Sequence, residues 1–159
     1  MQPHFFHPRD LDLRAEHLFW RHPPDKAFLE SLERLGQLTP ALVLLDRDRP
    51  PLLVAGARRA EGLLALRGRP LAAVLLDPDD PENPRSEADD LPLPLYLGLC
   101  YLASNAERTA TEAMLVAAGR YFTRHGSLED FLTLAGPYLF PAGDRRARQV
   151  AAWLGLPRE

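Results

Sequence analysis

Sixteen prolines limit the length of every helix and strand that this chain can form. They concentrate at positions 23–24, 50–51, 78–84 and 92–94. Proline fixes its own φ angle and has no backbone N–H, so helix interiors and central strands exclude it. We therefore expect short elements, with turns at the proline clusters.

The clearest predicted helix follows Pro24. Asp25 is a residue type that caps helix N-termini, and Gly36 takes the left-handed conformation that ends a helix without steric cost. Between them, apolar residues recur at three- and four-residue spacing: Phe28, Leu29, Leu32 and Leu35. This spacing gives one apolar face and predicts a helix over 25–35.

Apolar runs and helical periodicity predict the other elements. Residues 1–20 have no clean periodicity. Strands are expected at 40–45, 52–55 and 71–76, with a polar turn at 46–51. Helices are expected at 58–67, 93–104, 110–124, 127–135 and 144–154, and an acidic loop at 77–90. This order of elements predicts an α+β fold. It would consist of a small mixed β-sheet with helices, followed by a helical C-terminal extension.

Composition excludes several classes of protein. The formal net charge of −3 and the pI of about 6.0 give no sign of a nucleic-acid binder. Cys100 is the only cysteine, so no intramolecular disulfide can form. No apolar run approaches the roughly 20 residues of a membrane span, and no signal peptide is visible. We expect a soluble cytoplasmic protein with no membrane association.

The five histidines do not have the spacing of metal ligands. They are His4, His7, His17, His22 and His125. His4 and His7 are three residues apart but stand close to the N-terminus. We therefore expect no metal site built from protein side chains.

The segment Gly56-Ala57-Arg58-Arg59 suits an anion, because a strand ends in glycine and two arginines open the next helix. A helix N-terminus presents unpaired N–H groups and a partial positive charge, and arginine adds a planar fork for phosphate oxygens. Positively charged side chains interact unfavourably with the helix dipole at an N-terminus, so we expect another interaction to compensate for them here. The alternative is that Arg58 and Arg59 are surface charges paired with Glu61 or a nearby aspartate.

Two further segments indicate a function only when they are considered together with this one, in their order along the chain. Gly36-Gln37-Leu38-Thr39-Pro40 is a helix end followed by the start of a strand. Ser104-Asn105-Ala106-Glu107-Arg108 places an asparagine and an arginine three residues apart, on one face if the segment is helical. Taken alone, the second segment is also a polar helix boundary, with Thr109 or Thr111 as the next helix cap.

Together the three segments resemble the ParB N-terminal family of the ParB/sulfiredoxin superfamily. That family has a Gly-Gln-x-x-Pro segment, a Gly-Glu-Arg-Arg-like box that opens a helix, and a later Glu-Asn-x-x-Arg box. The resemblance covers about residues 18–125. It implies a nucleotide-binding domain at 1–108 and a helical extension at 109–159.

The resemblance also implies a ligand and a set of site residues. ParB-like proteins bind CTP with Mg²⁺, and the family was earlier labelled nuclease-like. By position, Arg58 and Arg59 would hold the phosphates and Gly56 would allow their approach. The Gln37 and Thr39 loop would complete the site, and Asn105 and Arg108 would close over it.

Two departures from the family pattern bear on catalysis. Ala57 and Ser104 stand where the family boxes have glutamates. The change at Ser104 removes a carboxylate that could help to hold Mg²⁺. We therefore expect binding with weak or absent hydrolysis. The sulfiredoxin branch needs a cysteine in the glycine box, where this chain has Ala57 and Arg58, so that branch is not expected.

The helical extension has two interpretations. In chromosome-partitioning ParB proteins a helix-turn-helix follows the Asn/Arg box, and here Ser127 could cap its first helix while Arg145, Arg146 and Arg148 could contact DNA. However, the apolar connection at 135–143 is longer than the usual turn of that motif. The alternative is a helical cap in which Val150, Trp153 and Leu154 pack inward.

The sequence leads to a ParB-like domain that binds a nucleotide, with CTP as the expected ligand, within a DNA-associated assembly. Whether the chain is an enzyme stays open: a nuclease or a nucleotide-dependent phosphotransferase on the same fold is one alternative. A ligand-free interaction module is another. We expect the isolated chain to bind DNA weakly, and tighter binding to need a homodimer or another partner.

Overall fold

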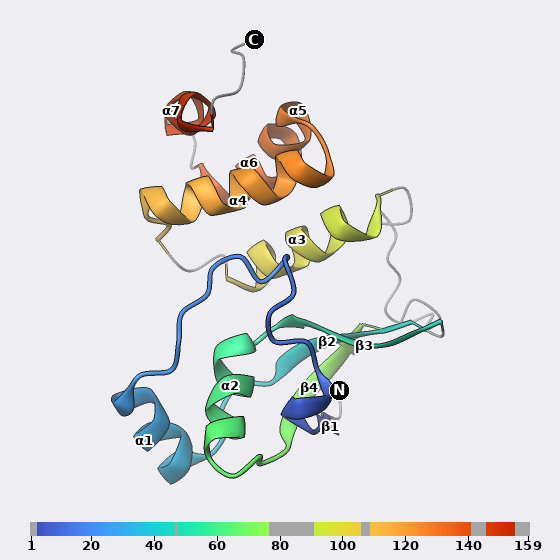
Figure 1. Cartoon of the computed structure of the whole chain (residues 1–159), viewed down its shortest axis with the longest axis vertical. Coiled ribbons are helices and arrows are strands. Elements are labelled where there is room, and N and C mark those ends of the chain that lie inside the picture. The colour runs from blue at the N-terminus through green and yellow to red at the C-terminus, as the bar shows by residue number, and fades with distance from the viewer. Residues whose placement is uncertain (1–2, 47, 77–90, 106–108, 141–145, 155–159) are drawn as a thin grey trace. The chain divides into compact units, whose positions relative to one another are not determined.

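The computed structural model describes residues 3–46, 48–76, 91–105, 109–140 and 146–154 (Figure 1). The chain forms two compact units, Met1–Asp89 and Asp90–Glu159. The first contains a mixed β-sheet with two longer helices, and the described part of the second is helical. The predicted α+β fold with a helical C-terminal part is confirmed. The two units divide at residues 89 and 90, whereas the resemblance placed its boundary after residue 108.

The first unit contains the predicted helix with both of its predicted caps. Helix α1 spans Lys26–Leu35, and the Asp25 side chain accepts a hydrogen bond from the Phe28 N–H at 2.8 Å. At the other end, Gly36 has a φ of 74° and donates its N–H to the Leu32 carbonyl at 2.9 Å. The local signals in the sequence were sufficient to define this element.

The sheet has four strands in the order β1-β4-β2-β3. Strands β2 (Ala41–Asp46) and β4 (Leu71–Leu76) are parallel, while β3 (Arg49–Ala55) pairs antiparallel with β2. Strand β1 (His4–Phe6) pairs antiparallel with β4. The sequence predicted β2, β3 and β4 but not β1, because three residues are too few for a visible alternation of polar and apolar side chains.

Strand β3 begins three residues earlier than expected and includes two prolines. The predicted turn at 46–51 contains the start of the strand, because Arg49 already pairs with Asp46. Strand β3 lies at the edge of the sheet, and adjacent residues of a strand direct their nitrogens to opposite sides, so one of Pro50 and Pro51 faces the open side, where a missing N–H costs no ladder hydrogen bond. The other proline faces β2. The register shifts between Leu44 and Asp46, next to these prolines.

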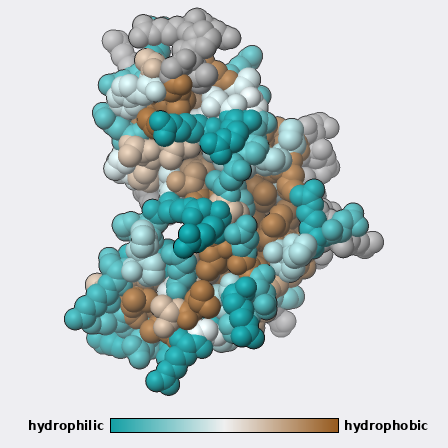
Figure 2. Space-filling view, in the orientation of Figure 1, coloured by the Kyte–Doolittle hydropathy of each residue, from teal (hydrophilic) through white to brown (hydrophobic). Residues whose placement is uncertain are grey.

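Helices α1 and α2 (Ala57–Ala65) pack closely because a glycine lies at their contact. A Cβ atom on Gly62 would stand 2.8 Å from Leu32 Cδ2 and 3.2 Å from Phe28 Cε2. The apolar face of α1 therefore lies directly on the α2 backbone. Figure 2 shows hydrophobic residues among hydrophilic ones over this part of the molecule. Leu35, Leu38 and Leu64 are exposed.

A segment without strands or long helices joins β1 to α1 through the 3₁₀ turn η1 (Pro8–Asp10). Its apolar side chains Leu11, Leu18 and Trp20 are buried, as is His17. The His17 Nε2 atom lies 2.7 Å from the Leu53 carbonyl oxygen, which makes it the donor in a hydrogen bond to β3. Burial lowers the pKa of His17, and the hydrogen bond to Leu53 and the charge of Asp12 oppose this effect.

The second unit is built around buried aromatic side chains. Its described helices are α3 (Leu93–Ser104), α4 (Glu112–His125), α5 (Leu128–Asp130), the π-helical turn η2 (Phe131–Ala135), α6 (Gly136–Leu139) and α7 (Arg146–Trp153). Phe122 and Phe131 are fully buried, with ring centroids 6.3 Å apart. Gly98 lets α3 approach α4, since a Cβ there would lie 2.8 Å from the Tyr121 ring.

Two helices of the second unit begin at caps that the sequence predicted. Thr111 caps α4 through the Met114 N–H, which selects it over Thr109. Ser127 and Asp130 form a reciprocal capping box at α5, as a serine cap at this position predicts.

The sequence predicted an irregular apolar connection at residues 135–143, but the first part of this segment is helical. The helical path continues through η2 and α6 to Leu139, so that part of the prediction is wrong. A proline in a helix has no N–H to donate and its ring collides with the carbonyl four residues earlier. The wider π-helical turn before Pro137, where Gly136 donates to the Phe131 carbonyl, relieves that collision.

The buried His17 predicts a pH-dependent loss of stability. Because its pKa is lower in the folded than in the unfolded protein, its contribution is complete above the unfolded value of 6.5 and falls as the pH drops below that value. We expect His17→Gln, which keeps an N–H donor without a titratable ring, to lose less unfolding free energy than wild type between pH 7 and pH 5. Urea unfolding at both pH values measures this difference. The exposed residue His22 provides the control His22→Gln, which should behave as wild type; equal losses in all three proteins would contradict the assignment.

Candidate functional site

The N-terminus of α2 has the arrangement that the sequence predicted. Strand β3 ends at Ala55, Gly56 is the N-cap with φ 104° and ψ 23°, and α2 begins at Ala57. No side chain of the described residues caps this helix. The first-turn N–H groups lack partners within the helix itself, which leaves partial positive charge beside Arg58 and Arg59.

Gly56 is required by packing as well as by its backbone conformation. A Cβ atom on Gly56 would lie 2.7 Å from the Ala41 Cβ and 3.2 Å from the Ala41 Cα. It would also stand 3.3 Å from Nη2 of Arg59. The start of β2 and the start of α2 therefore meet at this glycine.

Arg59 ties the first turn of α2 to the segment that enters β2. Its Nη1 donates hydrogen bonds to the carbonyl oxygens of Thr39 at 2.6 Å and Pro40 at 2.8 Å. These carbonyls precede the first residue of β2 and have no neighbouring strand residue opposite them in the β2–β4 register. Arg59 thus satisfies backbone acceptors at the point where strand pairing begins.

Gln37 completes the same connection from the sheet side. Its side-chain amide donates to the Ala72 carbonyl at 2.7 Å and accepts from the Ala72 N–H at 2.8 Å. The amide therefore pairs with β4 as a neighbouring strand would, just before β2 begins. Its Nε2 also lies 3.0 Å from the Thr39 carbonyl, which Arg59 shares. Gln37, Thr39, Gly56 and Arg59 are accordingly brought together.

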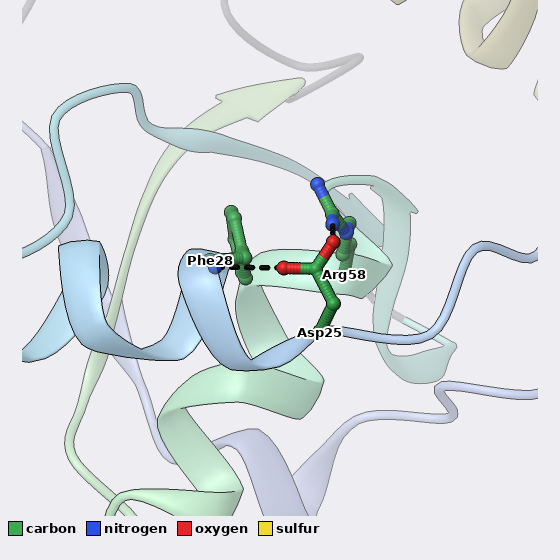
Figure 3. Close-up of polar contacts among 3 residues, drawn as sticks. All are labelled: Asp25, Phe28 and Arg58. Atoms are coloured by element: carbon green, nitrogen blue, oxygen red, sulfur yellow. Dashed lines mark hydrogen bonds and ion pairs between the residues drawn. The ribbon is translucent and has the colours of Figure 1, made fainter.

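Arg58 points the other way, toward α1 (Figure 3). Its Nη2 lies 3.2 Å from Oδ2 of Asp25, and its guanidinium carbon lies 4.2 Å from the centre of the Phe28 ring. The Arg58 side chain is 25% exposed, and its buried Nε has no hydrogen-bond partner among the described residues. The alternative of an arginine paired with a nearby aspartate therefore describes the Arg58–Asp25 contact.

The residues of the Asn/Arg box belong to the second unit. Asn105 is the C-cap of α3, with its N–H on the Leu102 carbonyl and its Nδ2 on the Tyr101 carbonyl at 2.7 Å. Ser104 bonds back to the Cys100 carbonyl. Asn105 thus forms the predicted polar helix boundary, while Arg108 lies outside the described residues.

The three arginines expected to contact DNA have different environments. Arg146 donates to the Ala110 carbonyl at 3.1 Å and so fastens α7 to the segment before α4. Arg148 is exposed. Arg145 lies outside the described residues. The extension therefore presents one described, exposed arginine of the three. Val150 is buried, as the helical-cap interpretation expected, and Leu154 is half-buried, but Trp153 is 39% exposed, so the expectation that it packs inward is wrong.

Sequence reasoning missed the partners that fix the two arginines. Asp25 was recognised as a helix cap and Phe28 as part of an apolar face, but nothing in the local sequence joins them to Arg58, which is 33 residues further along the chain. The side chain of Gln37 was expected to face a ligand, whereas it bonds to β4.

No group of three or more His, Cys, Asp or Glu side chains in the described parts of the chain could hold a metal ion. Within the same residues, the helices are all too short or too polar to cross a lipid bilayer. No protein-family model matches the sequence, and comparison with curated proteins found no significant match.

The Gly56–Ala41 contact can be tested with a double-mutant cycle. Gly56→Ala should cost about 1–3 kcal/mol of unfolding free energy from backbone strain and a further 1–3 kcal/mol from overpacking against Ala41. Ala41→Gly removes the atom nearest to the added methyl group, so the double variant should be more stable than the sum of the single changes predicts. Urea denaturation of the four proteins gives the coupling energy, expected at about 1 kcal/mol or more. Additive effects would contradict the packing argument.

Proposed function

We propose that the first unit binds the phosphate groups of a nucleotide at the N-terminus of α2, with Arg58 as the principal charged ligand. The observation that carries this proposal is the buried Nε–H of Arg58, which has no acceptor among the described residues. An unsatisfied donor on a charged group is costly, and a phosphate oxygen is the acceptor that a guanidinium fork binds best. The resemblance to ParB-like domains suggests CTP as the nucleotide.

The two arginines have separate roles in this proposal. Arg59 holds the Thr39–Pro40 backbone in place through its Nη1 and so positions the loop beside Gly56. Gln37 supports the same loop through its bonds to Ala72 and Thr39. The additional closing contacts from Asn105 and Arg108 rest on the resemblance alone.

The described residues do not fit a magnesium ion held by protein carboxylates at this site. Ala57 and Ser104 replace the glutamates of the family pattern, and Asp25 already bonds to Arg58 and to the Phe28 N–H. We therefore propose a site that recognises phosphate by hydrogen bonds and charge, without hydrolysis as its function. Association with DNA, either directly or through a homodimer, remains part of the proposal from the resemblance.

A specific observation also favours the ligand-free interaction module. Both arginines have intramolecular partners: Asp25 and Phe28 for Arg58, and two backbone carbonyls for Arg59. Such contacts stabilise a fold without any ligand. Direct binding measurements separate the two functions.

Phosphate binding predicts a ligand-dependent rise in stability. Titration with pyrophosphate, sulfate or CTP should raise the melting temperature, because only the folded state binds, and 100 times the Kd corresponds to about 2.7 kcal/mol. Arg58→Ala should abolish the rise. The matched control is Arg34→Ala, which removes the same charge from the exposed end of α1 and should respond as wild type does. If none of the three anions stabilises the wild-type protein, the proposed function is wrong.

The missing glutamates predict weak or absent nucleotide hydrolysis. Phosphate release would be measured with CTP, ATP and GTP, in the presence and absence of Mg²⁺ and of duplex DNA. We expect rates close to those of a protein-free control, because the Asp25 carboxylate at the site is already bonded to Arg58 and to the Phe28 N–H. In addition, the described residues contain no group of three or more His, Cys, Asp or Glu side chains that could hold a metal ion. Rapid magnesium-dependent turnover would favour the enzyme alternative.

A further inference from the structure

We propose that Asp25 is an internal competitor for the phosphate ligand and thereby determines how strongly an anion must bind to occupy Arg58. The inference rests on the proposed function and adds a residue that neither the sequence motifs nor the resemblance includes. It follows from the way in which one carboxylate is shared between a helix cap and an arginine.

The Asp25 carboxylate divides its two oxygen atoms between two tasks (Figure 3). Oδ1 accepts the Phe28 N–H at 2.8 Å and caps α1. Oδ2 lies 3.2 Å from Nη2 of Arg58. Asp25 therefore accepts one hydrogen bond from Arg58, from Nη2 to Oδ2, and the pair lacks the second parallel bond of a bidentate arginine–carboxylate pair.

This single contact leaves the Nε atom of Arg58 without a hydrogen-bond acceptor among the described residues. Nε and Nη2 form one edge of the fork, and Asp25 engages Nη2 alone, while the buried Nε has no partner in the described part of the chain. Because Nε is buried while Arg58 contacts Asp25, a ligand can reach it only after the guanidinium turns away from that carboxylate. A phosphate group then offers two oxygens at the spacing of this edge, so it can satisfy both donors. The ligand therefore gains a hydrogen bond that Asp25 does not supply.

The competitor is weak enough to be displaced. The Asp25 side chain is 64% exposed, and ion pairs with such solvent contact contribute little to stability. Loss of the Arg58 contact leaves the Oδ1 cap of α1 intact, so displacement need not unfold the helix. Phe28, 4.2 Å beneath the guanidinium, provides a surface along which the fork can turn away from Asp25.

The test compares variants that keep the cap but lose the charge. Serine and asparagine are both good N-cap residues, so Asp25→Ser and Asp25→Asn should preserve α1. The dissociation constant for pyrophosphate, measured by calorimetry and by thermal shift, should fall about two- to fivefold in both variants. Glu33→Gln is the matched control, because it removes one negative charge from an exposed position on the same helix. It should bind as wild type does.

The outcomes separate this inference from the proposed function. Binding by all proteins with equal affinity would overturn the competition by Asp25 and leave phosphate binding standing. A gain in Asp25→Ser that persists after Arg58→Ala is added would also overturn it, because the effect would not pass through Arg58. Binding by neither wild type nor the Asp25 variants would overturn both. Binding by the wild-type protein that becomes tighter in the Asp25 variants and requires Arg58 would support it. Binding seen only in the Asp25 variants would contradict the proposed function of the wild-type protein.

Discussion

The close approach of Gly56 to Ala41 is the constraint on which the rest of the first unit depends. It places the start of α2 against the start of β2, with 2.7 Å between the Ala41 Cβ and the position that a Cβ on Gly56 would take. Arg59 can reach the Thr39 and Pro40 carbonyls because its helix begins beside them. Gln37 then joins the same segment to β4. A bulkier residue at position 56 would separate these elements and leave several backbone acceptors without donors.

The contrast between Arg58 and Arg59 follows from helix geometry. Successive residues of an α-helix project about 100° apart, so adjacent arginines on one turn face different neighbours. Arg59 faces the sheet and donates to main-chain carbonyls, whereas Arg58 faces α1 and contacts a carboxylate and an aromatic ring. The same residue type therefore stabilises the fold at one position and offers a ligand-binding edge at the next.

Local rules of sequence reading predicted much of this fold. The caps at Asp25, Gly36 and Ser127 were visible because capping depends on residues three or four positions apart. Strand β1 was not visible, because its pairing with β4 connects residues more than 60 positions apart and its three residues carry no periodicity. The π-helical turn before Pro137 was missed because a proline normally predicts the end of a helix.

The sequence predicted the strand, glycine and helix start around Arg58 and Arg59, but not the contacts of these arginines. The glycine and the two arginines indicated a charged helix start, which the structure has. The Arg58–Asp25 pair and the bonds of Gln37 to Ala72 depend on how distant elements pack, and no pattern in the local sequence contains that information. The same limit applies to Arg146, whose bond to Ala110 crosses 36 positions.

The most direct test of the site observes the arginine side chains themselves. Nuclear magnetic resonance resolves the Nε–Hε signals of Arg58 and Arg59, and single alanine variants assign them. During titration with pyrophosphate, the Arg58 signal should shift progressively as its Nε–H gains an acceptor, together with the amides of Gly56 and Ala57. The Arg59 signal should change much less, because its guanidinium is held by the Thr39 and Pro40 carbonyls. An Arg58 signal that does not move at saturating ligand, or does not move more than that of Arg59, would contradict the account.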